Sequence, residues 1–248
     1  SRGLGDVYKR QILCLSVGLP VRAQLQDPRH NLAIGINGGV NLSSVSFEPS
    51  IKQKTFITPS VGVTVRYISE RYFKILCGIQ GEINYSQRGW KENIDDGTGD
   101  TYQRTMNYIE VPLMAHLGFG KDKGNGARFV LNIGPQIGFL LGENEKQSAS
   151  WHPEDRPNGV IWQYGKMAEM KFDYGIVGGG GLEVRTGIGN FLLEARYYFG
   201  LSDFYHSTKK DPFSRSAHSY IAGRLTYLFD IKTVSYTHLR AHETSLHL

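Results

Sequence analysis

The feature that most constrains this 248-residue chain is an alternation of apolar and polar side chains that recurs in eight long segments. A period of two residues is typical of a β-strand with one apolar and one polar face. Between Tyr72 and Arg88, for example, Ile79 and Ile83 share one parity, whereas Gln80 and Glu82 share the other. The predicted strands are Asn31–Ser46, Thr55–Ile68, Tyr72–Arg88, Tyr102–Gly118, Ala127–Leu141, Ala168–Arg185, Asn190–Leu201 and His218–Phe229.

The lengths of these segments favour a membrane-spanning barrel over a soluble sandwich. They run to 12–18 residues, whereas soluble strands usually have about 5–6 residues and a tilted membrane strand needs at least about 9–11. The connections alternate between short turns and longer polar loops, as in outer-membrane barrels. The short ones are Ser69–Arg71, Lys121–Gly126 and Thr186–Gly189, and the long ones are Glu48–Lys54, Gly89–Thr101, Gly142–Met167 and Ser202–Ala217. We therefore expect an all-β fold, an eight-stranded antiparallel up-and-down transmembrane β-barrel of the outer-membrane type.

Charged residues on the polar parity are expected to face the barrel interior. An eight-stranded barrel is just wide enough for its own side chains to fill it, and a buried charge must be paired. Acidic and basic residues occur in equal numbers in this set, which favours a paired plug over a water-filled pore. The predicted network consists of Arg66, Glu82, Arg104, Glu110, Glu183, Glu194, Arg196 and Arg224. Glu110 is the best candidate for an interior salt bridge. Its neighbour Pro112 cannot donate to the ladder and predicts a bulge or local irregularity.

Both ends of the chain are expected to lie outside the folded domain. Residues 1–11 (SRGLGDVYKRQ) and 234–244 (VSYTHLRAHET) match the two senses of one transposon-based sequencing adapter. We therefore interpret residues 1–11 and 234–248 as read-through of library DNA. Residues 12–23 are interpreted as the remnant of a signal peptide that is cleaved after Ala23. Residues 24–233 then form the barrel.

Charge and cysteine content exclude several classes of protein. Without the ends the formal charge falls from +5 to about +2, which removes the main support for nucleic-acid binding. Cys77 is then the sole cysteine, so no disulfide framework or cysteine metal motif is expected. No stretch of the mature chain approaches the roughly 20 apolar residues of a membrane helix. We expect no cofactor and no metal, and a monomer.

Four stretches resemble the PorT-like outer membrane β-barrel family of Bacteroidota. They are Gly81–Gly89 (GEINYSQRG), Tyr108–Leu113 (YIEVPL), Asp173–Gly178 (DYGIVG) and Glu194–Leu201 (EARYYFGL), of which YIEVPL is the most specific. The resemblance covers essentially Asn31–Phe229. It implies an outer-membrane location, an eight-stranded barrel and no agreed catalytic residues. The name-giving member of the family is linked to type IX secretion and gliding.

The loop Gly142–Met167 is the candidate binding surface. It carries Trp151, His152, Trp162 and Tyr164 among acidic residues. Exposed tryptophans are favoured anchors for a ligand or partner. Anchoring at the membrane interface is the competing interpretation, because aromatic girdles flank such barrels. The acidic tract Glu92–Asp100 lacks the full spacing of an EF-hand and is interpreted as a solvated loop.

Two histidines are weighed as catalytic groups. His116 lies within a predicted strand with no serine or carboxylate tied to it by a motif, which favours a hydrogen-bonded interior residue. His218 and Ser219 lie near the outer rim, but adjacent residues of a strand face opposite ways. We therefore expect no catalytic residues.

The sequence thus predicts a non-enzymatic outer-membrane protein with a structural or loop-mediated binding role. Its expected partners are outer-membrane lipid and a protein or glycan ligand at the external loops. The alternative is an accessory component of a secretion or surface-assembly system, as the resemblance implies. A third reading is a lipid-modifying enzyme embedded in the membrane, which requires a histidine to meet a serine or carboxylate at a rim.

Overall fold

The structure is a computed structural model that describes residues 29–72, 75–120, 125–155 and 160–235. The residues interpreted as adapter (1–11) and as signal remnant (12–23) lie outside these residues, as does the second adapter segment from residue 236 onward. Val234 and Ser235, which the sequence assigns to the adapter, nevertheless pair with His30 and Arg29 in the sheet. The long strands are β1 (Arg29–Glu48), β3 (Phe56–Tyr72), β4 (Ile75–Glu92), β5 (Tyr102–Gly120), β6 (Gly126–Gln147), β7 (Phe172–Thr186), β8 (Gly189–Gly200) and β9 (Arg215–Ser235). The short elements are strand β2 (Gln53–Lys54) and the 3₁₀ turn η1 (Pro153–Asp155).

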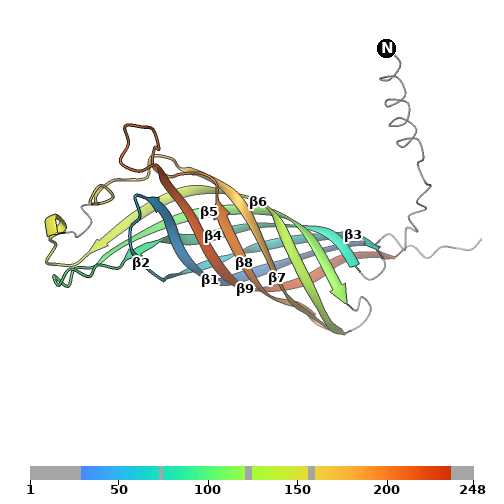
Figure 1. The fold of residues 1–248 in the computed structure, drawn as a ribbon. Helices are drawn as coiled ribbons and strands as arrows, with labels where there is room; N and C mark the ends of the chain where they lie inside the picture. The colour runs from blue at the N-terminus through green and yellow to red at the C-terminus, as the bar shows by residue number, and fades with distance from the viewer. Residues whose placement is uncertain (1–28, 73–74, 121–124, 156–159, 236–248) are drawn as a thin grey trace, which may run out of the picture.

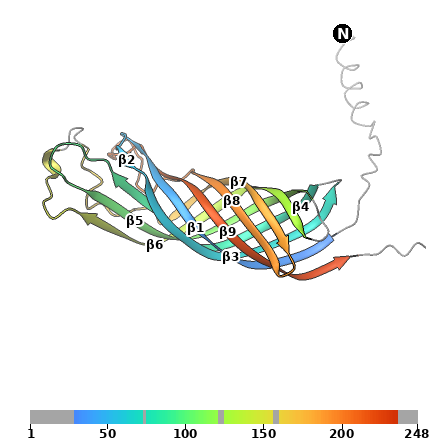
Figure 2. The ribbon, with the colours of Figure 1, turned by 90° about the horizontal axis from the view of Figure 1, so that it is seen from below.

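The nine strands of the described residues form one closed antiparallel sheet (Figures 1 and 2). The ring closes because β1 pairs with β3 on one side and β9 on the other, while β4 pairs with both β3 and β5. The two-residue β2 pairs only with the end of β4 at the rim. Consecutive long strands are otherwise neighbours, as in an up-and-down barrel. The predicted eight-stranded barrel is confirmed, with β2 as a small addition.

The structure corrects three local predictions. Ser69–Arg71 is not a turn, because β3 continues to Tyr72 with a register shift between Ile68 and Glu70. Pro112 causes no bulge, since β5 keeps its register with β4 on both sides of it. The predicted local irregularity is confirmed, because the pairs between β4 and β5 skip Val111 and Pro112, as expected of a proline without an N–H.

The third correction concerns the long loop after β6. This strand extends to Gln147, so the segment Gly142–Gln147, predicted as loop, continues the pairing with β5. The register shifts between Asn107 and Tyr108 of β5, where Leu141 is the extra residue on β6. Such a bulge exchanges the two faces of the strand beyond it.

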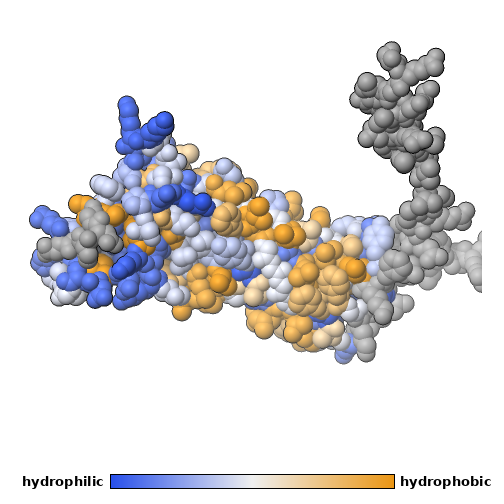
Figure 3. Space-filling view, viewed as in Figure 1, coloured by the Kyte–Doolittle hydropathy of each residue, from blue (hydrophilic) through white to orange (hydrophobic). Residues whose placement is uncertain are grey.

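The outward face of the barrel is an apolar band. On β6, Leu131, Ile133 and Ile137 are exposed, and Figure 3 shows apolar side chains along the wall and hydrophilic ones at the loop end. Aromatic rings meet at both edges of the band, as in the girdles of membrane barrels. Those toward the loops are Phe139, Phe172 and Tyr174, and those toward the turns are Phe191, Tyr227 and Phe229. The described residues contain no helix long and apolar enough to cross a membrane.

Glycine makes room in the wall for the inward side chain of Arg196. A Cβ atom on Gly179 would lie 2.3 Å from the carbonyl oxygen of Ala195 and 2.8 Å from Cγ of Arg196. Any larger residue would therefore displace the Arg196 side chain or the backbone of β8.

An arginine on the apolar band tests the orientation of the wall. Ile133→Arg places a charge near the middle of the band and should lower the free energy of unfolding by about 2–4 kcal/mol. Asn144→Arg, on the same strand beyond the bulge, should change it by roughly 0–1 kcal/mol because that position lies outside the band. The measurement is a urea titration of folding into lipid vesicles. Equal effects of the two changes would show that the band does not face lipid.

Candidate functional site

The inward face of the barrel carries linked ion pairs instead of a pore. Near the turn end, the carboxylate of Glu183 binds Arg66 at 2.8 Å and Arg128 at 2.6 Å. At mid-height, Arg196 bridges Glu82 and Glu194, each at 2.7 Å. The members of these groups come from strands on different sides of the ring, so the pairs span the interior.

A third group lies toward the loops. Arg224 is 3.8 Å from Glu82 and 3.6 Å from Glu110, which connects this group to the one below. Glu110 binds Arg88 at 2.6 Å, and Arg88 also pairs with Asp173. The rings around the Arg88 guanidinium, at 4.6–5.0 Å, are those of Tyr108, Tyr198 and Tyr220. Bulky paired side chains of this kind fill an eight-stranded barrel.

All eight residues of the predicted network are buried, and each has an ion-pair partner. The prediction did not include five further members, which are Arg88, Arg128, Glu143, Glu145 and Asp173. The inward parity of Arg88 and Arg128 is visible in the sequence. Glu143 and Glu145 owe their inward direction to the bulge at Leu141, which the alternation does not reveal.

An aromatic cap covers the loop end of the barrel. We use this name for one packed cluster, which comprises Val45, Phe47, Trp90, Tyr102, Met106, Tyr108, Phe204, Tyr205 and Phe213. Phe47 contacts Trp90 edge-on at 5.0 Å between ring centres, and Phe204 stacks on Trp90 at 5.8 Å. Because Phe204 and Phe213 come from the loop between β8 and β9, the cap joins that loop to the wall.

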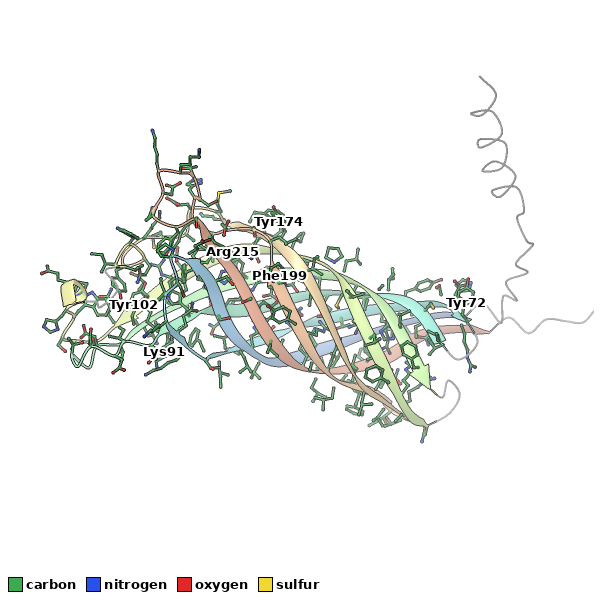
Figure 4. The ribbon with its side chains drawn as sticks, viewed as in Figure 1. Tyr72, Lys91, Tyr102, Tyr174, Phe199 and Arg215 are labelled. Atoms are coloured by element: carbon green, nitrogen blue, oxygen red, sulfur yellow. The ribbon has the colours of Figure 1, made fainter. Side chains whose placement is uncertain are left out.

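Arg104 fastens the second large loop, between β6 and β7, to the same cap. Its buried guanidinium pairs with Glu143 at 2.9 Å and with Glu145, and it donates to the Tyr205 hydroxyl at 3.0 Å and to the carbonyl oxygen of Lys166. Several charge-assisted bonds therefore meet at one side chain. Figure 4 shows the neighbouring Tyr102 and Lys91 at this end, far from Tyr72.

The two loops also bind each other. The backbone N–H groups of Glu169 and Met170 donate to the carbonyl oxygen of Phe204, at 2.9 and 3.0 Å. In return the N–H of His206 donates to the Glu169 carboxylate at 2.7 Å. This hydrogen bond, with a smaller contribution from Lys166, lowers the pKa of Glu169. Both loops are thus held in place by specific contacts.

The four residues of the predicted binding loop have different surroundings. Trp151 is half-buried and stacks on Tyr102 at 5.8 Å, and Tyr164 contacts the same ring at 4.8 Å. His152 is exposed and its N–H donates to Asp100. Trp162 is also exposed, with 48% of its surface accessible. The expectation of exposed tryptophans is therefore wrong for Trp151, because that ring packs against the cap.

His116 and His218, the two histidines weighed as catalytic groups, contact other polar side chains. His116 Nδ1 lies 2.8 Å from Oδ1 of Asn132, and His218 Nε2 lies 3.2 Å from the Tyr108 hydroxyl. Ser219 is on the outer face of β9, where its Oγ lies 3.2 Å from that of Ser44. Within the described ranges neither histidine hydrogen-bonds a serine or a carboxylate, and no group of three potential ligands can hold a metal ion.

The closed sheet, its apolar wall and its charged interior define a β-barrel that spans a membrane. A model of the outer membrane protein beta-barrel domain family matches residues 22–206, which is well over half of the chain. The chain belongs to this family, and the protein resides in the outer membrane, as the sequence predicts.

The solved structures that the chain matches are distant from it in sequence. Ail of Yersinia pestis, in complex with the heparin analogue sucrose octasulfate, is 11% identical over 82% of this chain and 100% of its own, with a TM-score of 0.34. OprG of Pseudomonas aeruginosa is 10% identical over 82% and 96%, with a TM-score of 0.41. The translocator domain of NalP of Neisseria meningitidis is 11% identical over 91% and 95%, with a TM-score of 0.32. None of them informs function, and the comparison with curated proteins gave no match.

Removing one carboxylate tests the interior network. Glu183→Gln leaves the buried Arg66 and Arg128 without their counter-charge and should lower the free energy of unfolding by about 3–5 kcal/mol. Glu154→Gln is the control, because Glu154 is exposed on η1. Urea titration in detergent micelles measures both. A loss below about 1 kcal/mol for Glu183→Gln would contradict a paired interior.

Removing the loop anchor tests the cap. Arg104→Ala should free the loop between β6 and β7, so that trypsin cleaves at Lys166 and Lys171 at least about tenfold faster, because the loss of roughly 1.4 kcal/mol increases local opening tenfold. The barrel should still show the heat-dependent shift in gel mobility of a folded membrane barrel. Lys91→Ala, at the same rim, is the matched control. Unchanged cleavage in Arg104→Ala would show that the loop is held by other contacts.

Proposed function

We propose that this outer-membrane barrel is non-enzymatic and uses its two large external loops to bind a protein or a glycan. The observation that carries the proposal is the anchoring of both loops by buried side chains of the barrel, above all Arg104. Loops that are ordered before binding lose less conformational entropy when a ligand arrives. The loops are therefore suited to recognition.

The interior supports binding over transport. The ion pairs around Arg66, Arg88 and Arg196 occupy the lumen, and the aromatic cap covers its loop end. A solute would have to break several buried ion pairs to cross the barrel, at a cost of about 3–5 kcal/mol for each pair. The loop surface is the part that remains accessible from outside.

Exposed apolar side chains provide the anchors for a partner. They belong to the loop between β6 and β7, and comprise Ile161, Trp162, Met167 and Met170. Trp162 contacts Phe213 of the other loop edge-on at 6.2 Å, so its ring is supported from one side. Tryptophan is among the residues most enriched in binding hot spots, and methionine adapts to different partners.

An accessory role in secretion or surface assembly remains the alternative, and it depends on the finer PorT-like assignment. The two proposals differ in the partner that they require. An accessory subunit must bind other envelope proteins of its own cell, whereas a receptor or adhesin binds outside it. Chemical cross-linking in the native envelope, followed by identification of the linked proteins, distinguishes them.

Binding by whole cells tests the proposal. A Gram-negative host that displays the barrel is applied to arrays of glycans and of purified secreted and envelope proteins, beside a host without it. The double variant Trp162→Ala, Met167→Ala should weaken the resulting binding about 30-fold, because hot-spot residues contribute about 2 kcal/mol or more.

Asn144→Ala is the matched control, because Asn144 is exposed and lies outside the apolar band but belongs to β6 and not to the loop. All variants must keep the heat-dependent shift in gel mobility, which shows that the barrel has folded. Binding that is equal in the parent and the double variant would overturn a role for this loop, and no binding by the parent would overturn the proposal.

A further inference from the structure

A hollow of about 320 Å³ lies on the outside of the barrel, where the wall meets the loop between β8 and β9. Its apolar lining consists of Phe199 and Leu201, which are 40% and 50% exposed, together with Ala217. The N–H of Leu201 donates to the carbonyl oxygen of Tyr174 at 2.9 Å, so this lining lies level with the aromatic girdle on the loop side. Figure 4 shows Tyr174, Phe199 and Arg215 together on this side of the barrel. The hollow is therefore at the interface between the hydrocarbon region and the external headgroups.

Two opposite charges line this hollow without pairing. Glu48 of β1 and Arg215 of β9 are directly opposite each other in the sheet, and both side chains are exposed. Opposite charges at such a cross-strand position attract each other. In the part of the chain that the structure describes, however, neither side chain forms an ion pair. The guanidinium of Arg215 instead lies over the Phe199 ring, 5.5 Å from its centre.

The guanidinium of Arg215 is placed to bind a phosphate group. Phe199 pairs with Ser219, which lies four residues further along β9 toward the bilayer, so the arginine side chain reaches down the wall toward the membrane. A planar guanidinium donates two parallel N–H bonds to a phosphate. Lipid phosphates lie directly outside the hydrocarbon region, which is the level of this side chain.

Two carboxylates in the same lining disfavour a ligand that is only an anion. Besides Glu48, Asp203 lines the hollow, and one of its oxygens accepts a hydrogen bond from the N–H of Ser216. One guanidinium against two carboxylates leaves an excess of negative charge, which repels a phosphate that brings no positive charge of its own. A primary ammonium group on the same ligand balances the carboxylates, and it has three N–H donors for their oxygens.

We propose that the hollow binds the headgroup of an outer-leaflet lipid that carries both a phosphate and a primary ammonium group. The phosphate pairs with Arg215, and the ammonium group lies between Glu48 and Asp203. The acyl chains leave the hollow past Phe199 and Leu201 and follow the apolar band of the wall. The volume is at the lower end of the roughly 300–1,000 Å³ of small-molecule sites, which suits a headgroup whose chains remain in the bilayer.

This lipid site is separate from the surface that the proposed function assigns to an external partner. Trp162 and Met167 belong to the loop between β6 and β7, whereas the hollow lies beside the loop between β8 and β9. Asp203 and Ser214 stand near the two ends of that second loop, and both line the hollow. A bound headgroup therefore contacts the base of the loop and the wall at once.

Native mass spectrometry of the purified barrel in detergent tests the proposal, because it measures the binding of single lipid molecules. The probes are phosphatidylethanolamine, phosphatidylglycerol and phosphatidylcholine with identical acyl chains, and free phosphoethanolamine is the competitor. Phosphatidylglycerol has no ammonium group, and phosphatidylcholine has methyl groups in place of the N–H donors. The variants are Arg215→Gln and Glu48→Gln. Their matched controls are Lys91→Gln and Glu154→Gln, which make the same changes of charge outside the hollow.

We expect phosphatidylethanolamine to bind the parent and both control variants about tenfold more tightly than the other two lipids, because it alone forms charge-assisted bonds with both signs of charge. Arg215→Gln should weaken its binding about tenfold or more, since the phosphate loses its partner. Glu48→Gln should reduce the preference for phosphatidylethanolamine over phosphatidylglycerol to below about threefold, because only the ammonium contact is weakened.

Four results would overturn the inference. They are equal binding of the three lipids to the parent, equal binding of phosphatidylethanolamine to Arg215→Gln and Lys91→Gln, an undiminished preference in Glu48→Gln, and displacement of the lipid by an equal concentration of free phosphoethanolamine. The last result would show that the ligand is a soluble headgroup compound and not a lipid. All four variants change side chains on the outer surface and should keep the heat-dependent shift in gel mobility, which confirms that the barrel has folded.

Discussion

The hydrocarbon core of a bilayer holds no water that could hydrogen-bond to a protein backbone. Every backbone N–H and C=O group in the hydrocarbon region needs a partner within the protein, and a sheet meets this demand only when it has no edge. The pairing of β1 with β9 removes the last edge. It extends from Arg29, which pairs with Ser235, to Glu48, which pairs with Arg215. Once the ring is closed, alternate side chains must face either lipid or the lumen, and the alternation of the sequence follows directly.

The lumen connects the membrane part to the external surface. Asp173 pairs with Arg88 inside the wall and accepts a hydrogen bond at 2.6 Å from Ser202, the second residue after β8. Above it, Arg104 and the aromatic cap fix the loops. The same polar side chains that keep the interior filled therefore also attach the described parts of the loops to the barrel wall.

The sequence predicts the barrel well and the contacts between strands poorly. The sequence shows that Arg66 and Glu183 face inward, because the face of a residue follows from the alternation of side chains within its own strand. Their pairing across 117 residues depends on the tilt and relative shift of β3 and β7, for which the alternation holds no information. The loop has no periodicity at all, so the inward packing of Trp151 could not be foreseen. The prediction of a turn at Ser69 was wrong because a strand that extends beyond the membrane can carry polar residues on both faces.

The bulge at Leu141 has a consequence for how such a surface can evolve. Insertions at exposed positions of the loop beyond Gln147 leave the pairing of β6 with β5 unchanged. A single insertion or deletion between Leu141 and Glu143 would instead turn Glu143 and Glu145 away from Arg104, the side chain that also binds both loops. Changes of length are thus tolerated at exposed positions of the loop. A few residues earlier, between Leu141 and Glu143, they would disrupt the ion pairs of Arg104.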